Sequence, residues 1–191
     1  MERSRAESLN SYVTDMIALE EHIAKAIKAQ SEVHREKHPE EARMLTSMLG
    51  TIEAHAQMLE KFDAMDEDPG AAQQVAEAVK RAGAMLAGMG AAAIDALRHE
   101  KLAKNLRDDI TAFSLASTGY LMLLTSARAL RDEDVAGVAH RHLDDYAKMI
   151  VTLNKLIPDA VLHTLRDDEL PIDEGVTPGI LDAYREAWAQ A

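Results

Sequence analysis

Residues 110–127, ITAFSLASTGYLMLLTSA, form a run of eighteen uncharged positions in a chain in which 28% of all residues are charged. Such a run is typical of a membrane span, of a buried core helix, or of a helix that lacks the charged residues its fold normally uses. The run is at the short end for a bilayer span, and it contains several serines and threonines. We therefore expect a central helix that is buried on several sides, and we predict no membrane association.

The composition excludes several classes of function. The 191 residues suffice for one domain with a sizeable core. The 33 acidic and 21 basic residues give a net charge of -12, which repels phosphate backbones, so we expect no nucleic-acid partner. The chain has no cysteine and therefore no disulfide or thiolate metal site. Its first residues lack the apolar region of a signal peptide, and we expect a cytoplasmic protein.

The sequence predicts an all-α fold, because helix-forming residues dominate and no segment alternates apolar and polar residues with a period of two. Glycines, prolines and charged junctions divide the chain into helical segments that predict an antiparallel four-helix bundle over 1–170. Residues 171–191 form a C-terminal extension with a short amphipathic helix. The expected long helices cover about 5–37, 40–65, 106–131 and 133–157, with a helical crossover over 71–104 and short helices over 159–168 and 178–189.

In a helical bundle, apolar residues at steps of three and four form a stripe along each helix that faces the interior. Two of these stripes each contain one polar residue that can bind a metal. On the first helix, Glu20 interrupts the series of Leu9, Val13, Met16, Ile23 and Ile27. On the second, His55 interrupts the series of Leu45, Met48, Ile52, Leu59 and Phe62. The two side chains are therefore expected to face each other in the bundle core.

The sequence leaves two interpretations of these residues open. In the first, Glu20 and His55 form a buried pair, satisfied by hydrogen bonds from Ser117, Tyr120 or Tyr146, and no cofactor is expected. In the second, Glu20, His55 and His142, with Asp145 nearby, bind a single Fe, Mn or Zn ion with one open position. His142 and Asp145 can also form a pair at the surface. His34 and His38 are expected at a solvated helix end.

Three segments of the chain resemble the YciE/YciF family of ferritin-like bacterial proteins, which are associated with stress responses. They are DMIALEEHIAKAI (15–27), IEAHAQMLEKF (52–62) and YLMLLTSARALRDEDVAGVAHRHLDDYAKMIVTLNKLIP (120–158). The resemblance implies a ferritin-like bundle, in which Glu20 falls on the glutamate ligand of the first helix and His55 on the histidine ligand of the second.

The chain departs from that family at the remaining ligands. The family's glutamates on the fourth helix are replaced here by residues such as Ser117 and Tyr120, and its acidic position on the fifth helix falls near Asp145 or Tyr146. A di-iron site takes glutamates from all four helices, two of them in Glu-x-x-His motifs. The second helix lacks this motif, because position 52, three residues before His55, is isoleucine and not glutamate. We therefore predict that the di-iron site is degenerate and that no di-iron centre forms.

No nucleophile paired with a base and no phosphate-binding loop is visible in the sequence. The expected function is that of a non-catalytic, stress-associated bundle protein that acts by oligomerisation or partner binding. The alternative is a ferritin-like protein with metal-handling or oxidoreductase activity. The small residues of the crossover and the segment around Trp188 offer apolar area beyond the needs of the core, so we expect a homodimer.

Overall fold

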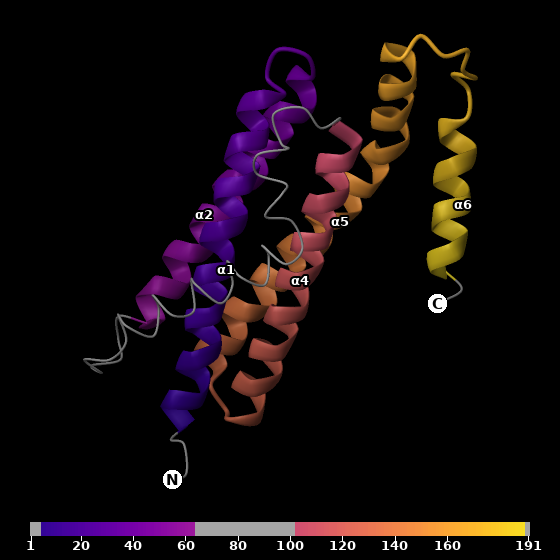
Figure 1. Ribbon diagram of the computed structural model, residues 1–191. Helices are drawn as coiled ribbons and strands as arrows, with labels where there is room; N and C mark the ends of the chain where they lie inside the picture. The colour runs from indigo at the N-terminus through magenta and orange to yellow at the C-terminus, as the bar shows by residue number, and fades with distance from the viewer. Residues whose placement is uncertain (1–4, 64–101, 190–191) are drawn as a thin grey trace.

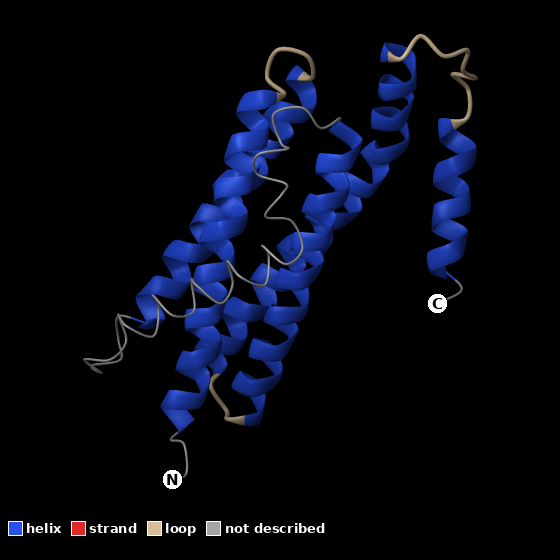
Figure 2. Cartoon of the chain, in the orientation of Figure 1, coloured by secondary structure: helices blue, strands red, loops and turns tan. Residues whose placement is uncertain are grey.

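The computed structural model describes residues 5–63 and 102–189, and every regular element in these ranges is a helix (Figures 1 and 2). This confirms the predicted all-α class for the described part of the chain. The predicted crossover lies outside the described residues except for its last turn, and His99 lies outside them too. The helices are α1 (Arg5–Val33), α2 (Pro39–Asp63), α4 (Leu102–Ala129), α5 (Glu133–Asp167) and α6 (Thr177–Ala189).

Four long helices, α1, α2, α4 and α5, pack side by side (Figure 1). A short turn joins α1 to α2, and another joins α4 to α5, so each pair is antiparallel. In addition, α1 packs on α4 and α2 packs on α5. Hydrogen bonds join Glu20 to Tyr120 and Gln30 to Asp109, so α1 and α4 also run in opposite directions. Buried apolar side chains from these four helices meet in one interior cluster.

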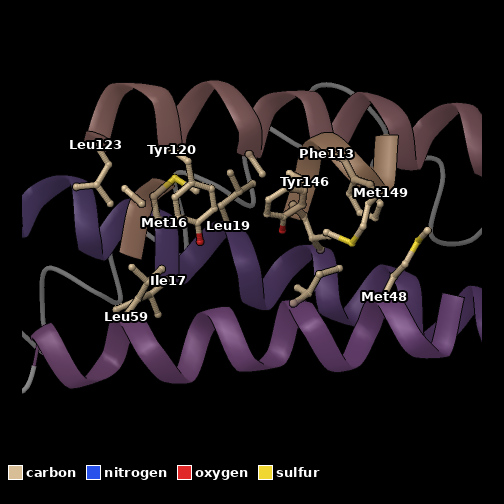
Figure 3. Close-up of a cluster of buried hydrophobic side chains, with 14 of the residues drawn as sticks. Met16, Ile17, Leu19, Met48, Leu59, Phe113, Tyr120, Leu123, Tyr146 and Met149 are labelled. Carbon is tan, nitrogen blue, oxygen red and sulfur yellow. The ribbon is translucent and has the colours of Figure 1, made fainter. Parts of the chain in front are cut away.

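Apolar side chains at steps of three and four residues fill this interior, as the hydrophobic pattern predicts. Figure 3 shows Tyr120 and Tyr146 pointing into it from α4 and α5, with Met16 beside Tyr120. On α4, helical spacing predicts an inward stripe of Ile110, Phe113, Ser117, Tyr120, Leu124 and Ala127. This stripe is partly wrong, because Ile110, Ser117 and Leu124 are only partly buried. The fully buried stripe is shifted by one residue at these three positions, to Asp109, Ala116 and Leu123.

The turn between α4 and α5 fixes the register of the two helices that carry the tyrosines. Arg131 takes a left-handed backbone conformation with φ of 59°, and Asp132 caps α5 by accepting a hydrogen bond from the Val135 amide at 3.1 Å. The Asp132 amide donates to the Ala127 carbonyl at 2.8 Å, which closes the turn. The antiparallel pair formed in this way brings the ring of Tyr120 beside that of Tyr146.

The predicted break at Pro158 is wrong, because α5 continues through it to Asp167. A proline inside a helix removes the hydrogen bond to the carbonyl four residues earlier, here that of Asn154. Packing on both sides of the proline compensates for this loss, since Leu156 and Ile157 contact the core and Ala160 is buried. The predicted helix over 159–168 is therefore the last part of α5. The first helix ends at Val33 rather than at residue 37.

The uncharged stretch on α4 is buried on one face only, so the expectation of burial on several sides is wrong. By length and composition, α4 is the one helix among the described residues that could cross a membrane, with a mean hydropathy of 1.3. Only 28% of the most apolar 18-residue segment of α4 is buried. The outward face exposes Leu121 and Met122 to solvent. The side of α4 away from α1 and α5 is thus both uncharged and open.

The C-terminal helix α6 contacts α5 but has no buried residue. The Thr177 hydroxyl donates to Asp159 at 2.7 Å, and Arg166 pairs with Glu174 in the preceding loop. Trp188 is 68% exposed, and its ring contacts Tyr184 of the same helix. The segment around Trp188 therefore contacts α5 without burying a residue of its own helix.

Candidate metal centre

The candidate centre begins with Glu20, which is fully buried on α1. The phenol of Tyr120 donates a hydrogen bond to Oε1 of Glu20, and that of Tyr146 donates to Oε2 at 2.6 Å. Burial, reinforced by the adjacent negative charge of Glu20, raises the pKa of both tyrosines well above the usual value. Both phenols therefore stay protonated, and each carboxylate oxygen has one fixed donor.

His55 lies between two carboxylates. Its Nδ1 is 3.3 Å from Oε1 of Glu20, and its Nε2 is 3.4 Å from Oδ2 of Asp145. The contact with Asp145 has the geometry of a long hydrogen bond, which places the proton of a neutral ring on Nε2. The contact with Glu20 is close, but it lacks the alignment of a hydrogen bond, and Nδ1 has no hydrogen-bond partner. In the tautomer with its proton on Nε2, His55 has a free electron pair on the buried Nδ1 atom.

His142 on α5 supplies a second unpartnered imidazole nitrogen. It is buried, so the expectation of a surface pair with Asp145 is wrong. Burial, with smaller contributions from His55 and Arg141, lowers the pKa of His142 to about 3. The ring is therefore neutral at physiological pH. Its Nδ1 is buried without a partner, and its ring meets that of Tyr120 edge to face at 5.0 Å.

Glu20, His55 and His142 converge from three helices, since one ligand atom of each lies within 4.8 Å of the others. Ligand atoms of a single tetrahedral zinc ion, each about 2.0–2.2 Å from it, are separated by roughly 3.4 Å. Side-chain rotations that close the distances by about 1 Å would therefore bring all three atoms onto one ion. The predicted site residues Glu20, His55 and His142 are thus brought together by the fold.

Asp145 lies outside this cluster and contacts the opposite side of His55. Its side chain is 38% exposed and accepts a hydrogen bond from Lys148 at 3.2 Å. Partial burial disfavours its ionisation, but hydrogen bonds from Lys148 and His55 outweigh that effect and lower the pKa of Asp145. A carboxylate bound to the outer nitrogen of a histidine orients the ring and fixes its tautomer. In this position Asp145 supports His55 and does not act as a direct ligand.

The surrounding polar residues differ in part from the prediction. Tyr120 and Tyr146 join the cluster as expected, whereas Ser117 is only partly buried, and among the described residues no hydrogen bond links it to Glu20 or His55. Glu53, two residues before His55 on α2, is exposed and lies outside the cluster. Within residues 5–63 and 102–189, Glu20 thus has two tyrosine donors, and no second carboxylate joins its cluster with His55 and His142.

A second buried polar cluster, which the sequence analysis missed, lies between α1 and α4. The Gln30 side-chain amide donates to Oδ1 of Asp109 at 2.7 Å, and Asn105 bonds to the ring of His34 at 2.7 Å. His34 is buried, so its expected position at a solvated helix end is wrong. The signal was available, because Gln30 and His34 extend the inward stripe beyond Ile27 at helical spacing.

Comparisons of the chain with protein-family models, with curated proteins and with solved structures give no significant match. The candidate centre is therefore interpreted from its own geometry.

Proposed function

We propose that the chain forms a ferritin-like four-helix bundle that binds one divalent transition-metal ion through Glu20, His55 and His142. Two observations carry the proposal. One ligand atom each of Glu20, His55 and His142 lies within 4.8 Å of the others, and the Nδ1 atoms of both histidines are buried without a hydrogen-bond partner. Each unpartnered buried polar atom costs about 1–3 kcal/mol. A bound cation would remove this cost at both nitrogens, and its charge would be attracted by Glu20.

The ligand types favour Zn²⁺, Fe²⁺ or Mn²⁺. Two imidazole nitrogens and one carboxylate oxygen suit these ions, and three protein ligands leave a coordination position open. One carboxylate balances only part of the charge of one divalent ion. A second ion would add two uncompensated positive charges to a low-dielectric interior, which is strongly unfavourable. The proposal is therefore a single-ion site in place of a di-iron centre.

The function that follows is metal handling, in which one ion is held within a helical interior of a cytoplasmic protein. All three ligands are buried, whereas Asp145 reaches solvent and contacts His55 from outside. Burial of the ligands favours retention of an ion over rapid exchange. The open position would allow a small molecule to reach the ion, which is what single-ion oxidoreductase chemistry requires.

Metal analysis of the purified protein tests this proposal. Protein stripped with a chelator and titrated with Zn²⁺ or Co²⁺ should bind one ion per chain, and the Co²⁺ absorption spectrum should report nitrogen and oxygen ligands. His142→Ala should weaken binding by at least about 10-fold. His140→Ala is the matched control, because His140 lies two residues away on α5 and is exposed. Equal affinities of the two variants, or two ions per chain, would refute a single-ion site.

A second candidate function is a non-catalytic, stress-associated bundle protein that acts through oligomerisation or partner binding. It is favoured by the hydrogen bonds from Tyr120 and Tyr146, which satisfy both oxygens of Glu20 without a metal. In that case the polar cluster specifies how the four helices pack. Failure of the stripped protein to bind Zn²⁺, Co²⁺, Fe²⁺ or Mn²⁺ at micromolar concentrations would favour this second candidate.

A further inference from the structure

A carboxylate links the candidate metal centre to the surface of the bundle. Glu20, His55 and His142 are buried, whereas the side chain of Asp145 is 38% exposed and contacts His55. The two oxygens of Asp145 contact different groups. Its Oδ2 is 3.4 Å from Nε2 of His55, and its Oδ1 is 3.2 Å from Nζ of the exposed Lys148. Asp145 therefore touches both the solvent and a residue of the centre.

Asp145 also lies at the side of the bundle where the helices pack on each other least. His55 belongs to α2 and Asp145 to α5. In the described part of the chain, α2 and α5 share the smallest of the four interfaces that join neighbouring long helices. The interfaces of α1 with α2, of α1 with α4 and of α4 with α5 are larger. An ion that approaches between α2 and α5 thus has the least packing to part, and it meets a carboxylate there.

The charges around Asp145 favour the capture of a cation. Although partial burial opposes it, hydrogen bonds from Lys148 and His55 lower the pKa of Asp145, so the carboxylate is ionised at neutral pH. The net charge of -12 attracts cations to the chain as a whole. Lys148 is exposed, and an exposed ion pair of this kind is weak. A divalent ion, with twice the charge of an ammonium group, can therefore replace Lys148 at Oδ1.

We propose that Asp145 is the entry ligand of the centre: an incoming divalent transition-metal ion displaces Lys148, binds Asp145 transiently and then passes between α2 and α5 to the three buried ligands. This inference rests on the proposed metal binding. The rings of His55 and His142 are stacked, so at least one of them must turn before both can bind one ion. An ion on the carboxylate would end the long hydrogen bond between Asp145 and His55, which leaves His55 free to turn.

The rate of Co²⁺ uptake tests this role. Stripped protein is mixed rapidly with Co²⁺, and the absorption of the bound ion gives the association rate constant. Asp145→Asn keeps the size of the side chain but removes its charge, so the rate constant should fall at least about tenfold at low ionic strength. Asp144→Asn is the matched control, because Asp144 is the exposed neighbour on α5, and it should change the rate constant by less than about twofold.

Replacement of Lys148 separates entry of the ion from support of His55, because Lys148 bonds to the oxygen of Asp145 that does not contact the ring. Lys148→Gln should raise both the association rate constant and the rate of Co²⁺ release to a chelator at least about threefold, since the carboxylate is reached more easily from either side. The dissociation constant should change by less than about twofold. Lys155→Gln, which removes the same charge about two turns further along α5, should change neither rate.

Two results would overturn the inference in distinguishable ways. If Lys148→Gln takes up Co²⁺ at the natural rate and Asp145→Asn only releases it faster, Asp145 orients His55 and has no part in entry, while the metal site stands. If the natural protein takes up no Co²⁺, the metal site itself is refuted, and the entry role with it.

Discussion

His55 on α2 and His142 on α5 stack face to face, with ring centroids 3.8 Å apart and planes inclined by 17°. Two protonated imidazoles could not share this position, because like charges repel strongly at such a distance. Burial keeps His142 neutral by lowering its pKa to about 3. The stack thus holds two side chains with their Nδ1 atoms buried and unpartnered. An imidazole binds a metal in the plane of its ring, and the planes of two stacked rings lie apart, so at least one ring must rotate out of the stack for both to bind one ion.

Metal binding should stabilise the fold. An ion that binds only the folded chain adds about 2.7 kcal/mol to the free energy of unfolding at a free concentration 100 times its dissociation constant. For a chain of this length, we expect Zn²⁺ or Co²⁺ to raise the midpoint of thermal unfolding by roughly 5–10 °C, and a chelator to reverse the change. Calorimetry or circular dichroism measures it. The same increase in the double variant His55→Ala, His142→Ala would show that the ion binds elsewhere.

Replacement of Glu20 should damage stability more than any oxidase activity. Glu20→Ala leaves the phenols of Tyr120 and Tyr146 without their acceptor and removes the carboxylate beside His55. Each stranded phenol costs about 1–3 kcal/mol, so we expect a total loss of roughly 2–6 kcal/mol in the free energy of unfolding, which urea unfolding can measure. Glu21→Ala is the control, since Glu21 is exposed on the same helix. A loss below about 1 kcal/mol for Glu20→Ala would contradict the importance of this cluster for the fold.

The tyrosine hydrogen bonds can be tested one at a time. Tyr146→Phe keeps the ring against Phe113 and Tyr120 but leaves Oε2 of Glu20 without its donor. We expect a loss of about 1–3 kcal/mol in the free energy of unfolding. In Tyr184→Phe, on α6, the same atom is removed from a ring that contacts the exposed Trp188, and unfolding should be unchanged. If the two substitutions have equal effects, the bond to Glu20 contributes nothing specific.

The sequence predicts the helices well because each long segment repeats its apolar residues at helical spacing. The same periodicity identifies Glu20 and His55, since each is the one polar member of an apolar stripe. It is less informative on α4, where uncharged residues occupy both the inward and the outward face, so periodicity does not separate them. For that reason the inward stripe predicted for α4 differs by one residue from the buried one at three positions. For the same reason the sequence predicts burial of the outward face, which is exposed.

Other features depend on contacts between helices that no local pattern encodes. The stack of His142 on His55 depends on how α5 is rotated against α2. Asp109 lies directly before the uncharged run, where the sequence pattern does not indicate burial. Continuation of α5 through Pro158 depends on packing on both sides of the proline. These are tertiary effects that outweigh local propensity. They explain why the second polar cluster was not predicted.

Within that second cluster, the Gln30 amide and the Asp109 carboxyl share one hydrogen bond, and each keeps one buried oxygen without a partner. The Gln30 amide donates to Oδ1 of Asp109, while Oε1 of Gln30 and Oδ2 of Asp109 are buried without partners. Burial raises the pKa of Asp109 to about 8, although the bond from Gln30 opposes the change, and the charge of Asp108 adds to it. A protonated Oδ2 can donate to Oε1 of Gln30, which would satisfy both atoms at neutral pH.

Asp109→Asn should therefore remove a loss of stability at alkaline pH. Between the ordinary pKa of 3.8 and the raised value of about 8, folded Asp109 holds a proton that the unfolded chain has released. Stability then falls as pH rises through this window, by at most about 1.4 kcal/mol per pH unit. Asparagine keeps both hydrogen bonds to Gln30 without a proton to lose. In urea unfolding the variant should match the natural protein at pH 4 and exceed its stability by roughly 2–5 kcal/mol at pH 8. Asp15→Asn, at an exposed position on α1, is the control and should leave the pH dependence unchanged. If the stability of the natural protein rises steadily from pH 5 to 8 and Asp109→Asn follows the same curve, Asp109 is ionised in the fold.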